Sequence, residues 1–183
     1  MKMFYKNKFK TIVNNILSIN KNFLVDLEKI IHEASNKKKK IIICGNGGSA
    51  STASHVAVDL TKNAGITAIN FNEANLITCF ANDFGYKNWL KKSIEYYADR
   101  GDVLILISCS GNSLNLVNAA KFAIKNGISV VTLTGCHKKN KLNMLSTKIN
   151  FWVNSKDYNV IEIIHHMMLL FLVDGIIYSK KLK

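Results

Sequence analysis

The chain has 183 residues, of which 48% are hydrophobic and 20% charged, a composition that supports one sizeable core and excludes a disordered protein. Its net charge is +13, but the lysines lie in loops and at element ends, without interleaved aromatic residues or a recognisable binding motif, so we expect no nucleic-acid partner. Four cysteines without a CxxC pair or secreted-type spacing predict reduced thiols in a cytoplasmic protein.

The first part of the chain is expected to be helical. Apolar residues recur at helical spacing from about residue 9 to residue 35, which predicts a long amphipathic helix, either continuous or broken once. Residues 1–10 are polar and no unbroken apolar run follows them, so we expect no signal peptide.

After a turn at 36–39, strand-like and helix-like segments alternate. The expected strands are 40–44, 67–71, 103–108, 129–134 and 148–153. The expected helices are 51–62, 114–126 and 158–178, with a helical stretch that breaks near 82–85. Such alternation indicates a parallel, doubly wound α/β sheet.

The last predicted helix is apolar enough to raise the question of a membrane span. It contains Glu162, His165, His166 and Asp174, and each of these would be costly in lipid. We therefore expect a helix buried in a core or in an interface between subunits, and no membrane partner. Together with the leading helix it leaves apolar surface that predicts a homo-oligomer.

Two short loops carry the functional signal. Residues 44–52 read CGNGGSAST and residues 108–113 read SCSGNS, and each follows an apolar strand and precedes a helix. Glycines let backbone N–H groups approach an anion, while the helix N-terminus and the hydroxyls add further favourable interactions. The loops lack the Lys-Ser/Thr pair of a P-loop and the third glycine of a dinucleotide fingerprint.

Either loop alone is more typical of a tight strand-to-helix turn with Ser and Asn as caps. Two hydroxyl-rich loops at equivalent places in one sheet favour a binding site for a small phosphorylated ligand, because ligands of open α/β sheets bind at the carboxyl ends of the strands.

The two loops in this order, with the segments ANDFGY at 81–86 and GDVL at 101–104, resemble the SIS (sugar isomerase) domain family of phosphosugar-binding proteins, and within it the phosphoheptose isomerases. The resemblance implies a three-layer α/β/α sandwich with a mostly parallel sheet, preceded by a long N-terminal helix. It covers a single domain over residues 1–183, with a helical segment at 1–36 and an α/β core at 37–183. It also implies a homo-oligomer, commonly a tetramer, with sites at subunit interfaces.

The same resemblance assigns site residues. It implies that four serines hold the sugar phosphate, namely Ser49, Ser108, Ser110 and Ser113, and that Asn46 and Asp83 lie beside the sugar.

The metal ligands depart from the family pattern. The resemblance implies zinc held by a His and a Glu four residues apart on the first helix of the core, and by a Gln and a His eight apart on the last. Here these positions carry His55 and Asp59, then Glu162 and Leu170. His166 follows Glu162 by one turn, so a rebuilt set of His55, Asp59, Glu162 and His166 is one option, and a site with no cofactor is the other. Each of these histidines could equally be a core or interface residue.

The expected reaction is an aldose–ketose isomerisation, which needs a base to move a proton between C1 and C2. Glu162 is the first choice for this base and Asp59 the second, with His55 and His165 as polarising groups. The expected substrate is sedoheptulose 7-phosphate or a related sugar phosphate used for surface-polysaccharide precursors. The alternative is a non-catalytic family member that binds sugar phosphates as a sensor or scaffold.

Overall fold

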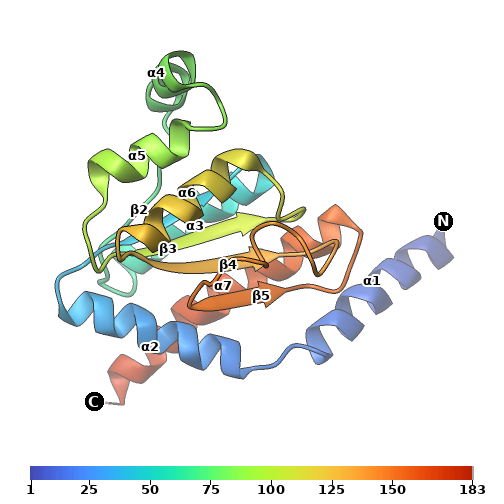
Figure 1. The fold of residues 1–183 in the computed structure, drawn as a ribbon. Helices are drawn as coiled ribbons and strands as arrows, with labels where there is room; N and C mark the ends of the chain where they lie inside the picture. The colour runs from blue at the N-terminus through green and yellow to red at the C-terminus, as the bar shows by residue number, and fades with distance from the viewer. Residues whose placement is uncertain (183) are drawn as a thin grey trace.

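The computed structural model describes residues 1–182 and has a five-stranded sheet at its centre (Figure 1). All neighbouring strands are parallel, in the order β2-β1-β3-β4-β5. The strands are β1 (Ile41–Gly45), β2 (Ala68–Ile69), β3 (Val103–Ser108), β4 (Ser129–Thr134) and β5 (Ile149–Trp152). The order reverses between β1 and β3, so the loops that follow these two strands lie side by side at the carboxyl edge of the sheet.

Helices cover both faces of this sheet. The helices of the described residues are α1 (Lys2–Leu17), α2 (Asn22–Asn36), α3 (Gly48–Lys62), α4 (Ala74–Phe84), α5 (Trp89–Tyr97), α6 (Leu114–Lys125) and α7 (Tyr158–Lys181). Of these, α4 packs on α5 and projects away from the sheet (Figure 1). Because side chains alternate along a strand, Ile41 and Ile43 pack with α2, α3 and α7 on one face, while Ile42 and Cys44 pack with α5 and α6 on the other. The predicted three-layer α/β/α sandwich is confirmed.

Several element boundaries differ from the sequence expectations. The leading helix begins earlier than expected, at Lys2, and takes the broken one of its two expected forms. Between α1 and α2 the Asn20 side chain accepts a hydrogen bond from the Asn22 amide, a local turn that competes with helix. Helix α3 begins three residues earlier than expected because Gly47, at φ +55°, turns the chain directly from β1 into the helix. Strand β2 is shorter than expected, since Asn70 closes a similar turn onto the Asn72 amide.

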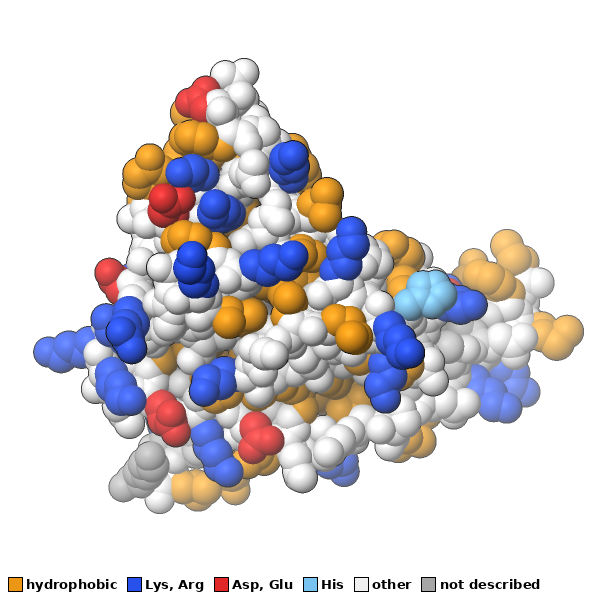
Figure 2. Space-filling view, viewed as in Figure 1, with side chains coloured by type: hydrophobic (Ala, Val, Ile, Leu, Met, Phe, Trp, Pro, Cys, Tyr) orange, Lys and Arg blue, Asp and Glu red, His pale blue; other side chains and the backbone are white. Residues whose placement is uncertain are grey.

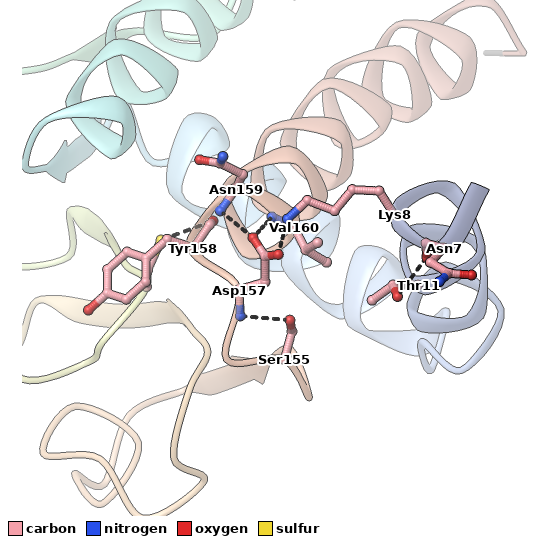
Figure 3. A network of polar contacts seen from close by, with 9 residues as sticks. Asn7, Lys8, Thr11, Ser155, Asp157, Tyr158, Asn159 and Val160 are labelled. Atoms are coloured by element: carbon pink, nitrogen blue, oxygen red, sulfur yellow. Dashed lines mark hydrogen bonds and ion pairs between the residues drawn. The ribbon is translucent and has the colours of Figure 1, made fainter. Parts of the chain in front are cut away.

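Helix α1 extends away from the body of the protein and is held at its inner end by α7 (Figure 1). The ammonium of Lys8 forms an ion pair with Asp157, the N-cap residue of α7. Asp157 in turn accepts hydrogen bonds from the amides of Asn159 and Val160, and Ser155 accepts one from the Asp157 amide (Figure 3). This network fixes where α7 begins, and therefore the direction in which its first turns point.

Helix α7 is long and apolar enough to cross a membrane by length and composition, with a mean hydropathy of 2.0 over its most apolar window. Half of that window is buried inside the protein. Residues Val160, Ile164 and Leu172 are fully buried, and they belong to the same core cluster as β1, β3 and β4. The helix therefore has the packing of a core element.

Candidate functional site

A small cavity, here called the serine pocket, opens where the loops after β1 and β3 meet the start of α7. Its volume is about 110 Å³. It is lined by Asn46, Ser49, Ile107, Ser108, Cys109, Ser110, Ser113, Leu116, Tyr158 and Glu162. Ligand pockets for whole small molecules measure about 300–1,000 Å³, so this cavity has the size of an anchoring site for one group of a larger ligand.

In the second loop, residues 108–113, the hydroxyl oxygens of Ser108 and Ser110 accept hydrogen bonds from backbone amides of the same loop. The Ser108 hydroxyl accepts a hydrogen bond from the Gly111 amide at 3.1 Å, and the Ser110 hydroxyl accepts one from the Asn112 amide at 3.2 Å. A hydroxyl has one O–H to donate, and in these two serines it remains available for a ligand. The loop therefore presents donors to the pocket, which is what an anionic group requires.

Two asparagines that sequence reasoning missed hold the loops in place. Asn115, which is 2% exposed, exchanges two hydrogen bonds with Asn46, at 2.9 and 3.1 Å, and so ties the second loop to the first. Asn140, which is 1% exposed, lies under Gly111, and a Cβ added at Gly111 would fall on its amide group. No spacing rule could have found these residues, because they come from α6 and from the loop after β4.

The carboxylate of Glu162 forms one wall of the pocket. It lies against the first residue of α3, so close that a Cβ added at Gly48 would be 2.6 Å from Oε2. The positive end of the α3 dipole favours an anion there. Oε1 is also 3.9 Å from the thiol of Cys109, and burial, reinforced by this negative charge, raises the pKa of that thiol to about 12. Cys109 is therefore present as a neutral thiol.

Three further predicted residues form a separate cluster between α3 and α7. His55 Nε2 is 3.2 Å from Asp59 Oδ2, and His55 Nδ1 is 3.1 Å from His166 Nε2. The two imidazole rings are nearly perpendicular, at 89°. Burial and the neighbouring His55 lower the pKa of His166. None of these three side chains lines the serine pocket.

Two predicted residues lie apart from both groups. His165 points to a different face of α7 from its neighbour His166: it is fully buried, its Nε2 is 3.1 Å from the Thr134 carbonyl oxygen, and its ring lies near Phe151. Asp83 lies at the exposed end of α4, where it accepts a hydrogen bond from the Asn82 side chain. Neither lines the serine pocket, although Tyr86, shortly after α4, reaches Asn46 at 3.4 Å.

Burial of His165 has a consequence for stability at acid pH. It lowers the pKa of this imidazole from 6.5 to about 4, so the folded state resists a proton that the unfolded chain accepts. The stability that the neutral ring contributes is present above pH 6.5 and is lost as the pH falls toward 4. We expect His165 to reduce the free energy of unfolding by about 2 kcal/mol between pH 7.5 and pH 5.

Urea unfolding of the wild type and of His165→Leu at both pH values would measure this difference. The leucine variant should lack this part of the pH dependence. Equal pH dependence in the two proteins would contradict the assignment.

The described residues, 1–182, include no group of three or more His, Cys, Asp or Glu side chains arranged to hold a metal ion. A larger hollow of about 550 Å³ lies between the α1–α2 turn and β5. Asp26 is the one titratable residue in its lining, which otherwise consists of amide, hydroxyl and apolar side chains. The chemistry of the site is therefore concentrated around the serine pocket and the histidine cluster.

Comparison with known proteins agrees with this geometry. The SIS domain family matches residues 4–135. The chain is 37% identical over 145 residues to a phosphoheptose isomerase of Buchnera aphidicola, covering 72% of this chain and 75% of the relative. It is 38% identical over 143 residues to the corresponding protein of Aliarcobacter butzleri, covering 75% of each.

A solved phosphoheptose isomerase structure from Neisseria gonorrhoeae superposes with a TM-score of 0.88 at 27% identity, covering 96% of this chain and 97% of the other. Family match, sequence identity and fold thus agree, and the chain belongs to the SIS domain family, in which it is similar to the phosphoheptose isomerases.

Proposed function

We propose that this protein is a cytoplasmic phosphosugar isomerase that interconverts an aldose phosphate and a ketose phosphate. The observation that carries the proposal is the serine pocket, in which four serine hydroxyls and one carboxylate converge at the junction of two strand-to-helix loops. The relatives named phosphoheptose isomerase support sedoheptulose 7-phosphate, or a related sugar phosphate used for surface-polysaccharide precursors, as the substrate.

Phosphate anchoring is the first step. The hydroxyls of Ser49, Ser108, Ser110 and Ser113 donate hydrogen bonds to the phosphate oxygens. The pocket lies at the N-termini of α3 and α6, whose dipoles favour the negative charge. Since the cavity holds little more than this group, the sugar extends from it, with Asn46 and Tyr158 at the pocket wall.

Proton transfer is the second step. Glu162 takes the proton from one of the carbons C1 and C2 and returns it to the other, through an enediolate. The positive end of α3, against which the carboxylate lies, stabilises the negative charge of that intermediate. Asp59, the second choice for the base, lies in the histidine cluster, and His165, expected as a polarising group, faces the sheet. We therefore assign the base to Glu162.

Ser110→Ala tests the anchoring step. A hydrogen bond to a charged group contributes about 1.5–3 kcal/mol, so the variant is expected to bind a sugar phosphate about tenfold more weakly, or worse. Titration calorimetry with sedoheptulose 7-phosphate measures the change, and Ser146→Ala, outside the pocket, is the control. Unchanged affinity in Ser110→Ala would place the ligand elsewhere.

We further propose that the protein assembles as a homo-oligomer, a tetramer by analogy with its family. Helix α1 has no buried residue, and it exposes Phe4, Phe9, Val13 and Leu17 on an arm that extends from the body (Figure 1). A second copy of the chain would cover this apolar surface. Light scattering should return a mass well above 20.5 kDa at micromolar concentration, whereas a mass at that value would refute the assembly.

The basic charge fits a small anionic ligand better than a nucleic acid. Figure 2 shows the Lys and Arg side chains spread over the visible face, among hydrophobic and acidic side chains, with no continuous stripe. Nucleic-acid binding uses basic residues gathered on one face or along one element.

A further inference from the structure

The zinc set that the family resemblance implies does not fit this site. Zinc in proteins takes three or four N, S or O donors at about 2.0–2.3 Å. Leu170 stands where the distal imidazole would be and has no donor atom. The carboxylate of Glu162 is turned toward Gly48 and Cys109, at the wall of the serine pocket. His55 and Asp59 are the remaining two of the four implied ligands.

His166 does not make up the missing donor. The two nitrogens of an imidazole point away from one another, and in His55 each already faces a partner: Asp59 at Nε2 and His166 at Nδ1. Because Asp59 and His166 lie on opposite edges of the His55 ring, a single ion cannot be bound by all three side chains. The histidine cluster has the geometry of a hydrogen-bonded chain and lacks that of a coordination shell.

The chemistry of the three side chains fixes the direction of this chain. An ionised carboxylate accepts hydrogen bonds and does not donate them, so Asp59 requires a proton on Nε2 of His55. In a neutral His55 the other nitrogen, Nδ1, then carries the lone pair and accepts. His166 must therefore donate from its Nε2. Both contacts are satisfied with both rings neutral, and each ring nitrogen of His55 is then engaged by a neighbour instead of a metal ion.

We infer that this protein has replaced zinc ligation by a hydrogen-bonded chain, Asp59–His55–His166, that joins α3 to α7. Residues 162, 166 and 170 are spaced by four on α7 and share the face that packs on α3. Along this face the serine pocket comes first, the histidine contact second and Leu170 third. The inference deepens the proposed isomerase function, because it concerns the site assigned to that reaction. Zinc binding can be measured without turnover, so the inference can be tested even if the proposed reaction is wrong.

Metal content is the first test. The wild-type protein and the variant His55→Ala would each be incubated with zinc chloride and desalted. Their zinc content would then be measured by inductively coupled plasma mass spectrometry. We expect the wild type to retain no more zinc than His55→Ala. In the variant Leu170→His a third donor is added on the face that carries His166, next to Asp59 and the Nε2 edge of His55, so zinc should rise toward one ion per chain.

Phe171→His is the matched control, because it adds the same imidazole one residue along α7, at a position that is 52% exposed. It should behave as the wild type. A wild type that holds one zinc per chain, lost in His55→Ala, would overturn the inference. So would a folded Leu170→His variant that gains no zinc, since Leu170 would then not be what excludes the metal.

Nitrogen NMR of histidine-labelled protein is the second test, and it needs no variant to fold. The chemical shifts of a protonated and an unprotonated ring nitrogen differ, so they report the tautomer. We expect His55 as the Nε2-protonated form and His166 with a proton on Nε2. A His55 protonated on Nδ1 would overturn the inference, whereas failure of the proposed isomerase would appear separately, as absent sugar-phosphate binding and turnover.

Discussion

Glu162→Gln is expected to lower the turnover of a sugar phosphate by a factor of about 10²–10⁴, the usual contribution of a positioned general base. The amide has nearly the same shape as the carboxylate and can keep its packing on Gly48, but it cannot accept the proton that moves between C1 and C2. Because we propose that the serines anchor the phosphate, affinity should persist. Steady-state kinetics and titration calorimetry on the same preparation would separate the two effects.

Asp59→Asn is the matched control for this change, since it makes the same carboxylate-to-amide replacement outside the serine pocket. It should reduce turnover less than Glu162→Gln. Solvent deuterium should enter C1 or C2 with the wild type, and much more slowly with the glutamine variant. Tight binding by the wild type without turnover or deuterium exchange would favour the sensor or scaffold function over the isomerase.

Gly111→Ala is expected to damage both the fold and the ligand site. Gly111 has φ +63°, a left-handed conformation that costs other residues about 1–2 kcal/mol. The added methyl group would also collide with Asn140, a buried side chain, at a typical overpacking cost of about 1–3 kcal/mol more. Since the Gly111 amide donates to the Ser108 hydroxyl, the loop at residues 108–113 should lose its shape. Sugar-phosphate affinity should then fall more than tenfold.

Gly65→Ala is the control that separates the cost of the left-handed backbone from the cost of the collision with a neighbouring side chain. Gly65 has nearly the same φ, +62°, but its nearest neighbour to an added Cβ is the Lys180 ammonium at 3.7 Å, an ordinary contact, and it lies outside the serine pocket. Urea unfolding should show the smaller loss in Gly65→Ala, and calorimetry should show its affinity unchanged. Equal losses of stability in the two variants would mean that Asn140 yields to the methyl group.

The parallel sheet and the serine loops could be predicted because their signals are local. Ile41–Ile43 and Val103–Ile107 are apolar runs bounded by glycine or serine, and parallel strands bring their carboxyl ends to one edge. The loops therefore had to meet wherever β1 and β3 pair. The position of the break in the leading helix and the short length of β2 depend on single asparagine side chains, and hydrophobic periodicity in the sequence does not reveal them.

The partners of the loops and the faces of α7 needed the folded structure. Asn115 and Asn140 lie against the loops from distant segments, and nothing in their neighbours in the sequence marks them. His165 and His166 differ by about 100° around the helix, so one faces the sheet and the other faces α3, but the spacing cannot say which. That assignment depends on how α7 is rotated, which its packing on the core decides.

The ion pair between Lys8 and Asp157 has a consequence for how the chain is made. The two residues are 149 positions apart, and α1 packs on α7, the last helix of the chain. At about 5–20 residues per second, a ribosome completes the docking site of α1 some 7–30 seconds after Lys8 has been added. During this time Ile12 and Ile16, which in the folded chain pack against the core cluster, have no partner. The first helix to be synthesised is therefore among the last to be placed, and a nascent chain that meets another copy too early is exposed to aggregation through this segment.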